Sequence, residues 1–172
     1  MCWILKYTKV RNVKSPERWT KHSSGIDFFI PNILLMKDIK NTPSEDIKPI
    51  NSIIRDGNIY INSGEWILIP SWIKTIIKSW YDLVFDNKSW ITVKKWLIIW
   101  AKVIDADYRW EIHLHLINTS SFAQKIKLWD KIAQAIIRKV ILWDIKNISK
   151  DKFEEYSKTE RWEGWFWSTG EK

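Results

Sequence analysis

The 172-residue sequence has one cysteine, five glycines and no long apolar run. A single cysteine, Cys2, cannot form a disulfide within the chain, which excludes a disulfide-stabilised scaffold and is typical of a reducing compartment. No stretch approaches the roughly 18 consecutive apolar residues of a membrane-spanning helix. The N-terminal stretch MCWILKYTKVR lacks the apolar core of a signal peptide. We therefore expect a cytoplasmic protein with no membrane segment.

Glycine is scarce, whereas tryptophan is abundant: the sequence has 14 tryptophans, and a chain of this length usually has about 12 glycines. Most tryptophans stand beside Ser, Lys, Asp or Pro at the expected ends of strands and in turns, as do Trp66, Trp72, Trp80, Trp96 and Trp129. The backbone often needs a positive φ there, and glycine is the default residue. Tryptophans packing a β core would instead recur every second residue within strands.

The remaining composition indicates one globular domain. Hydrophobic residues make up 45% of the chain and charged residues 28%, as is usual for a protein of this size with a substantial core. The net charge of +8 comes from lysines spread along the chain. The excess of Lys, Ile and Asn is typical of an AT-rich genome. We therefore expect no stable nucleic-acid binding.

Short β-branched runs between turn residues predict an all-β fold, a sandwich or a barrel. Residues 112–117 alternate between apolar and polar, as a half-buried strand does. The other expected strands are residues 59–61, 67–69, 73–77 and 83–85. A brief helix is expected at 150–156, or at 132–138 if that apolar run is not a strand.

The chain is expected to divide unequally. Residues 1–150 form the β domain, and residues 32–58, which contain Pro43 and Pro49, are expected to be an irregular surface segment between early strands. Residues 151–172 are polar and are expected to be a flexible C-terminal segment.

Five stretches resemble a known family once each Trp is replaced by Gly. They are SSGIDFF (23–29), KSWITVKKWL (88–97), KVIDADYRWEIHLHLIN (102–118), KLWDKIAQAII (127–137) and RWEGWFWSTGEK (161–172). In order and spacing they resemble the five motifs of the trimeric dUTP pyrophosphatases (dUTPases), over about residues 4–170. Five ordered motifs are a far more specific signal than one short pattern.

The resemblance implies a dUTPase-like β-barrel or jelly roll of the β-clip type that assembles as a homotrimer. It implies hydrolysis of dUTP to dUMP and pyrophosphate with Mg²⁺. It also implies that the C-terminal segment is exchanged between subunits and closes over a pocket formed by two others.

Phosphoanhydride hydrolysis needs an oriented water, a base and charges along the phosphates. Asp105, in a short turn between strands, is the best candidate base; alone it would read as a turn residue. By resemblance it also holds the 3′-hydroxyl, and Tyr108 packs beneath the sugar, where no ribose 2′-hydroxyl fits. By resemblance Asp27 supports magnesium through its water shell, which suits an ion that prefers phosphates and retained waters.

The phosphate contacts are assigned by resemblance to Lys88, Ser89 and Gln134. Lys88 replaces the family's Arg, so that it keeps the charge but loses the bidentate fork. In the C-terminal segment, Arg161 suits the terminal phosphate and Phe166 suits stacking on uracil. Hydroxyl and backbone donors of the segment come from Ser168 and Thr169.

The pattern of tryptophans suggests a hypothesis about the gene. Some bacterial lineages read UGA as glycine, and translating such a gene with UGA as Trp would write Trp at those positions. Tryptophan stands at every motif glycine except Gly25, Gly164 and Gly170. Most of the 14 tryptophans would then be glycines in the functional protein.

Other readings stay open. The dCTP deaminases share the barrel, but we do not find their glutamate-centred motif, and they are expected to lack the C-terminal stretch. A Trp-rich basic module could stack on single-stranded nucleic acid, although this does not account for the five motifs. A regulatory protein with this fold is a third reading. His113 and His115 share a strand face, but without a nearby Cys they are a weak zinc signal.

Overall fold

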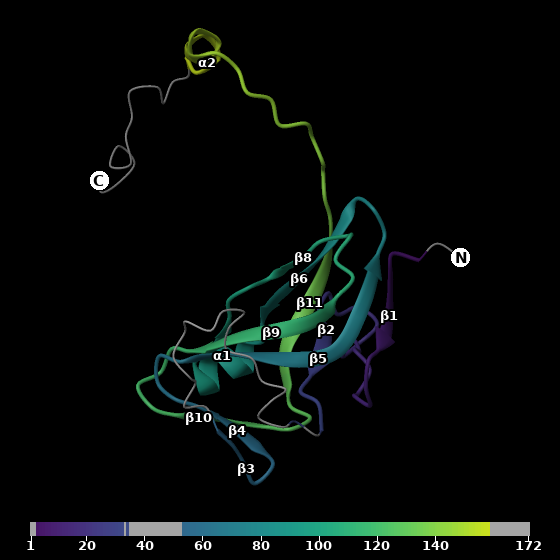
Figure 1. Cartoon of the computed structure of the whole chain (residues 1–172), viewed down its shortest axis with the longest axis vertical. Helices are drawn as coiled ribbons and strands as arrows, with labels where there is room; N and C mark the ends of the chain where they lie inside the picture. Colours follow the sequence, from purple (N-terminus) through teal and green to yellow (C-terminus); the bar gives the residue numbers. More distant parts are fainter. Residues whose placement is uncertain (1–2, 33, 35–52, 159–172) are drawn as a thin grey trace. The chain divides into compact units, whose positions relative to one another are not determined.

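The computed structural model describes residues 3–32, 34 and 53–158 (Figure 1). It confirms the all-β fold, with two short helices in this part of the chain. The strands are β1 Leu5–Lys9, β2 Ile26–Phe29, β3 Ile53–Arg55, β4 Asn58–Ile61, β5 Trp66–Ile77, β6 Tyr81–Asn87, β7 Leu97–Ile99, β8 Val103–Ile104, β9 Glu111–Asn118, β10 Gln124–Lys127 and β11 Lys131–Lys139. The helices are α1 Ser89–Lys95 and α2 Lys150–Tyr156.

The strands form two four-stranded sheets and one three-stranded sheet, and every pairing is antiparallel. Their orders are β1-β5-β9-β7, β2-β11-β6-β8 and β10-β4-β3. Strands far apart in sequence are therefore neighbours, and β11 lies between β2 and β6.

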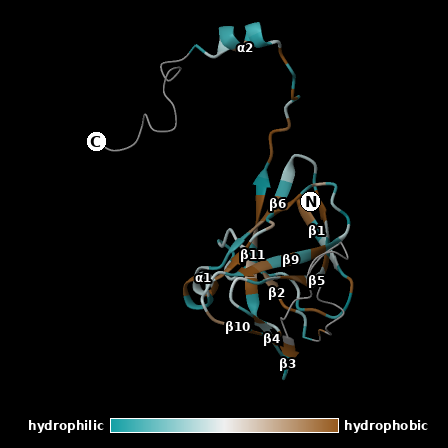
Figure 2. Cartoon of the chain, turned by 60° about the vertical axis from the view of Figure 1, so that its left-hand side comes forward, coloured by the Kyte–Doolittle hydropathy of each residue, from teal (hydrophilic) through white to brown (hydrophobic). Residues whose placement is uncertain are grey.

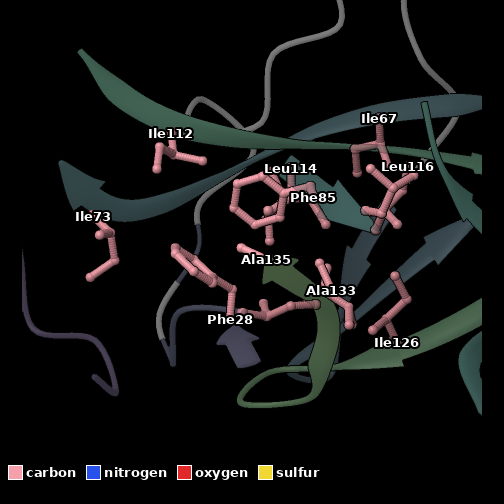
Figure 3. Packing of buried hydrophobic residues seen from close by; sticks show 14 of the residues in the cluster. Phe28, Ile67, Ile73, Phe85, Ile112, Leu114, Leu116, Ile126, Ala133 and Ala135 are labelled. Carbon is pink, nitrogen blue, oxygen red and sulfur yellow. The ribbon is translucent and has the colours of Figure 1, made fainter. Parts of the chain in front are cut away.

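The core is formed by side chains from all three sheets (Figure 3). Phe28 on β2 meets Phe85 on β6 edge to face, with ring centroids 4.8 Å apart, a favoured aromatic geometry. On β9 the buried side chains are Ile112, Leu114 and Leu116, which confirms the predicted alternation. Burial of one such side chain stabilises the fold by about 1.5–3 kcal/mol, so this face anchors the sheet.

The strands expected at 67–69 and 73–77 are one strand, β5, whose register with β9 shifts between Pro70 and Lys74. Trp72 lies in this irregular stretch with a φ of 56°. It is also buried in the core. Between these pairs β5 has two more residues than β9, so the chain bends at a bulge, and the gap in the sequence pattern marks this bulge rather than the end of a strand.

Three other expectations are corrected or decided by the structure. The strand β3 lies inside the segment expected to be irregular, the run 132–138 is part of β11, and α1 was not predicted. The helix expected at 150–156 is confirmed as α2, whose N-cap Ser149 accepts a hydrogen bond from the Lys152 amide, as N-caps typically do.

The chain divides into two compact units, residues 1–141 and 142–172. In the described part of the second unit, α2 has no buried residue and is largely hydrophilic (Figure 2). No helix in the described ranges is long and apolar enough to cross a membrane.

Candidate functional site

A strip of polar residues crosses three neighbouring strands. Gln134 on β11 pairs with Asp27 on β2 and with Asp86 on β6. Residues directly opposite each other in an antiparallel sheet point to the same face. Lys88 and Ser89 follow directly after β6, where α1 begins. The structure thus brings together Asp27, Lys88, Ser89 and Gln134, which come from three separate stretches of the sequence.

The carboxylate of Asp27 is only 6% exposed and is held by two ammonium groups. Lys88 Nζ donates to Oδ1, and Lys131 Nζ lies 3.3 Å from Oδ2. Lys131 also lies 3.1 Å from Glu17 Oε1. A buried carboxylate is tolerated when it is paired. The two lysines therefore explain why Asp27 can be buried and still carry its negative charge.

Two of these residues, Glu17 and Lys131, were missed by sequence reasoning. The hydrogen bond from Lys131, followed by that from Lys14, lowers the pKa of Glu17. Partial burial acts to lower the pKa of Lys131, but its hydrogen bonds to Glu17 and Asp27 outweigh this and raise it. Only the position of Lys131 within the KLWDKIAQAII stretch hinted at a role.

The side chain of Gln134 is fixed from two sides. Its Nε2 donates to the Asn87 carbonyl at 2.8 Å, and its amide lies against Gly25, where any Cβ would overlap Oε1. Asn87 is itself anchored, because its Oδ1 accepts from the Ile99 amide at 2.6 Å. The amide of Gln134 is therefore held at the strip.

Asp105 lies in a tight turn between β8 and β9, as predicted. The Tyr108 amide donates to the Asp105 carbonyl at 3.1 Å, and the Asp105 side chain is exposed. The ring of Tyr108 packs against the core, while its hydroxyl donates to the Glu111 carbonyl at 3.0 Å. Burial, followed by the charge of Glu111, raises the pKa of Tyr108. The tyrosine therefore stays neutral near pH 7.

The structure does not bring this turn to the strip within one chain. Ile104 pairs with Leu83, so Asp105 lies beyond the first residues of β6, whereas Lys88 follows its last residue, Asn87. With a rise of about 3.3 Å per residue, the two ends of this strand are roughly 20 Å apart. In Figure 1, β8 and α1 accordingly lie at opposite ends of β6. Within one chain, the turn that carries Asp105 and the strip therefore lie apart.

The surroundings of Asp27 do not form a direct magnesium site. The described part of the chain contains no group of three His, Cys, Asp or Glu side chains that could hold a metal ion. Both oxygens of Asp27 already face ammonium groups, which repel a divalent cation. The residues here do not fit direct coordination of Mg²⁺ by Asp27. The predicted contact of Asp27 with the water shell of the ion stays a prediction.

The four residues expected in the C-terminal segment lie outside the described residues. They are Arg161, Phe166, Ser168 and Thr169.

Comparison with protein families identifies the chain. The family model described as dUTPase matches residues 58–170, about two thirds of the sequence. The chain belongs to the dUTPase family. The match includes three of the five stretches and residues 161–170 of the last, and SSGIDFF lies before it.

Relatives in the dUTPase family support this assignment over different lengths. The deoxyuridine 5′-triphosphate nucleotidohydrolase of Nautilia profundicola is 36% identical over 115 residues, covering 66% of this chain and 78% of that protein. The Rickettsia akari protein of the same name is 30% identical over 172 residues, covering 96% of both. The Candida albicans protein is 45% identical over 83 residues. In that alignment the chain spans only half of the relative's length.

Solved dUTPase structures share the fold. A Staphylococcus bacteriophage 80alpha dUTPase with dUpNHpp has a TM-score of 0.71 at 18% identity and covers 97% of this chain and 98% of its own. The EIAV dUTPase has a TM-score of 0.61 at 18% identity, over 86% and 98%. At these identities the likeness establishes the fold alone.

Proposed function

We propose that this chain is a dUTP diphosphatase, which hydrolyses dUTP to dUMP and pyrophosphate. The observation that carries the proposal is the strip across β2, β11 and β6. It gathers Asp27, Lys88 and Gln134 from three stretches that resemble dUTPase motifs. Such an enzyme limits uracil in DNA and supplies dUMP for dTMP synthesis in the cytoplasm.

In this proposal the strip binds phosphates. The ammonium of Lys88 supplies charge, while Ser89 and Gln134 supply directed hydrogen bonds to phosphate oxygens. Asp105 accepts the proton of the attacking water and orients it towards the phosphorus. The ring of Tyr108, already packed against the core, forms the floor beneath the deoxyribose.

The strip and the turn that carries Asp105, as two half-sites, support a homotrimeric enzyme. Because β6 separates Asp105 from Lys88, a complete site needs the turn of one subunit beside the strip of another. Residues 1–150 would form the barrel. Residues 151–172 of a third subunit would close over the site. In that segment Arg161, Phe166, Ser168 and Thr169 take the roles given above.

Mg²⁺ is the proposed cofactor. It supplies neutralisation of the phosphate charge, and in proteins it is commonly bound through substrate phosphates and retained waters. Asp27 would contact the ion only through its water shell, and no residue of the described chain is assigned to its direct coordination.

We further propose that most of the 14 tryptophans are glycines in the functional protein. Five described non-glycine residues have a positive φ, and four of them are tryptophans: Trp72, Trp80, Trp96 and Trp129. Trp80 and Trp129 are the third residues of turns closed by the Tyr81 and Asp130 amides, the position at which a type II turn requires glycine.

Trp96 is the left-handed C-cap of α1, another position that favours glycine. A bulky residue held there costs about 1–3 kcal/mol. The backbone at these positions therefore supports glycine independently of the motif comparison.

Two experiments test these proposals. The codons of the gene decide the first point: UGG at Trp90, Trp110 and Trp129 would refute glycine recoding. The purified chain with glycine at the tryptophan positions should release pyrophosphate from dUTP and not from dCTP or UTP. Absence of pyrophosphate release from dUTP by a folded trimer would refute the function.

A further inference from the structure

Glu17 lies outside all five motif stretches, yet it is tied directly to the strip. It forms an isolated antiparallel bridge with Asp27. The Glu17 amide donates to the Asp27 carbonyl at 3.2 Å, and the Asp27 amide donates to the Glu17 carbonyl at 2.7 Å. Two backbone hydrogen bonds therefore fix the position of this carboxylate.

From Glu17 a row of alternating charges leads to the strip, and we name Glu17, Lys131, Asp27 and Lys88 the charge cluster. Glu17 pairs with Lys131 at 3.1 Å, Lys131 pairs with Asp27 at 3.3 Å, and Asp27 pairs with Lys88. The row runs from a partly exposed end, Glu17 at 41%, to the buried Asp27 at 6%.

The formal charges of these four residues cancel, and Lys14, 3.3 Å from Glu17 Oε1, adds one positive charge at the outer end of the row. Asp27 is shared by two ammonium groups, and Lys131 is shared by two carboxylates. The attraction of an anion to Lys88 therefore depends on the whole row. The positive charge of Lys131 offsets the negative charge of Asp27, and the negative charge of Glu17 offsets that of Lys131. The two outer residues act on the anion with opposite signs.

We propose that Glu17 and Lys131 are positioning residues that set the affinity of the strip for a polyphosphate, Lys131 raising it and Glu17 lowering it. This inference rests on the proposed function, in which Lys88 receives the triphosphate. Its consequence for turnover is that Glu17 limits the retention of pyrophosphate, the product that carries most of the charge.

Opposite effects are expected from the two charge-removing substitutions. Glu17→Gln should tighten binding of the imido analogue dUpNHpp about threefold, and Lys131→Met should weaken it about threefold. This is the size expected for one charge acting on several phosphate charges through partly screened solvent. Lys131→Arg should restore affinity, because it keeps the charge. If the pair were merely structural, both substitutions would weaken binding.

Matched controls come from the β3–β4 hairpin. Arg55→Met and Asp56→Asn change the net charge as the test variants do, at a pair whose side chains are 68% and 85% exposed, respectively, and 3.9 Å apart. Neither control should change affinity by as much as the test variants. The changes in affinity caused by the test substitutions should also become smaller when the NaCl concentration is raised.

The experiment is calorimetric titration of the full-length chain with glycine at the tryptophan positions, and of its variants, with dUpNHpp and with inorganic tripolyphosphate. Opposite shifts for both ligands support the inference. If dUpNHpp binds but both substitutions change its affinity in the same direction, the inference is overturned and the proposed function stands. Opposite shifts for tripolyphosphate without preferential binding of dUpNHpp overturn the proposed function and leave the charge cluster standing. Binding of neither ligand overturns both.

Discussion

Gly25 lies against the side chain of Gln134, so closely that a Cβ on residue 25 would overlap Oε1 and stand 3.1 Å from Cδ. The backbone of one stretch thus serves as a wall for the amide of another. Since the overlapping atom is the end of a flexible side chain, a larger residue would move that amide rather than unfold the sheet.

Gly25→Ala should therefore impair activity more than stability. Displacing Gln134 removes its hydrogen bond to the Asn87 carbonyl, which is worth about 1 kcal/mol. We expect kcat/KM for dUTP to fall about tenfold, with little change in melting temperature. The double variant Gly25→Ala/Gln134→Ala should be no worse than Gln134→Ala alone. An additive loss in the double variant would contradict this contact.

Glycine at the strained turn positions should stabilise the chain. In Trp80→Gly and Trp129→Gly, relief of a positive φ at exposed indoles outweighs the greater flexibility of the unfolded chain. We expect a gain of about 1 kcal/mol at each position in urea unfolding. Trp143→Gly is the control. Trp143 is 82% exposed, and it is not one of the described residues that have a positive φ. Equal effects at Trp143 and Trp80 would refute the strain argument.

His115 should make folding pH-dependent. Burial lowers its pKa, and its buried Nε2 has no hydrogen-bond partner. The unfolded chain then binds a proton more readily than the folded chain. Its contribution to stability is complete above the unfolded pKa of about 6.5 and is lost as the pH falls, by at most about 1.4 kcal/mol per pH unit.

Urea unfolding between pH 7.5 and pH 5 measures this dependence. His115→Phe should flatten the profile, whereas the exposed His22→Asn should leave the slope unchanged. A profile that is identical with and without His115 would rule out this histidine as its source.

Mixed oligomers test whether sites are shared. Asp105→Asn and Lys88→Met should each be inactive alone, because each removes one half-site from every complete site. Co-expressed in equal amounts, they should regain about a quarter of the parental activity, since random assembly places an intact turn beside an intact strip in that fraction of sites. No recovery in verified mixed trimers would show that each site lies within one chain.

Most of the sheet could be predicted because its strands are β-branched runs with clear periodicity. The helix α1 could not: Ile91, Thr92 and Val93 favour a strand, and burial of Ile91 overrides that preference. The bulge at Trp72 was equally hidden, since a gap between two apolar runs looks the same whether the strand ends or bends.

At the site, residue types were predictable but contacts were not. Asp27 and Lys88 were both named from the sequence, yet their pairing depends on β2 and β6 flanking β11. Glu17 gave no signal at all, because it joins Asp27 through a single bridge outside any strand. Asp105 was placed in its turn correctly, but its distance from Lys88 follows only from the register of β8 with β6.

The length of β6 has a consequence for how turnover should respond to dilution. A paired strand cannot fold back on itself, so no loop movement within one subunit can bring the turn that carries Asp105 to the strip. Under the proposed function, activity per subunit should therefore fall steeply once the protein is diluted below the concentration at which its subunits associate. The cell's supply of active enzyme would then rise faster than linearly with expression.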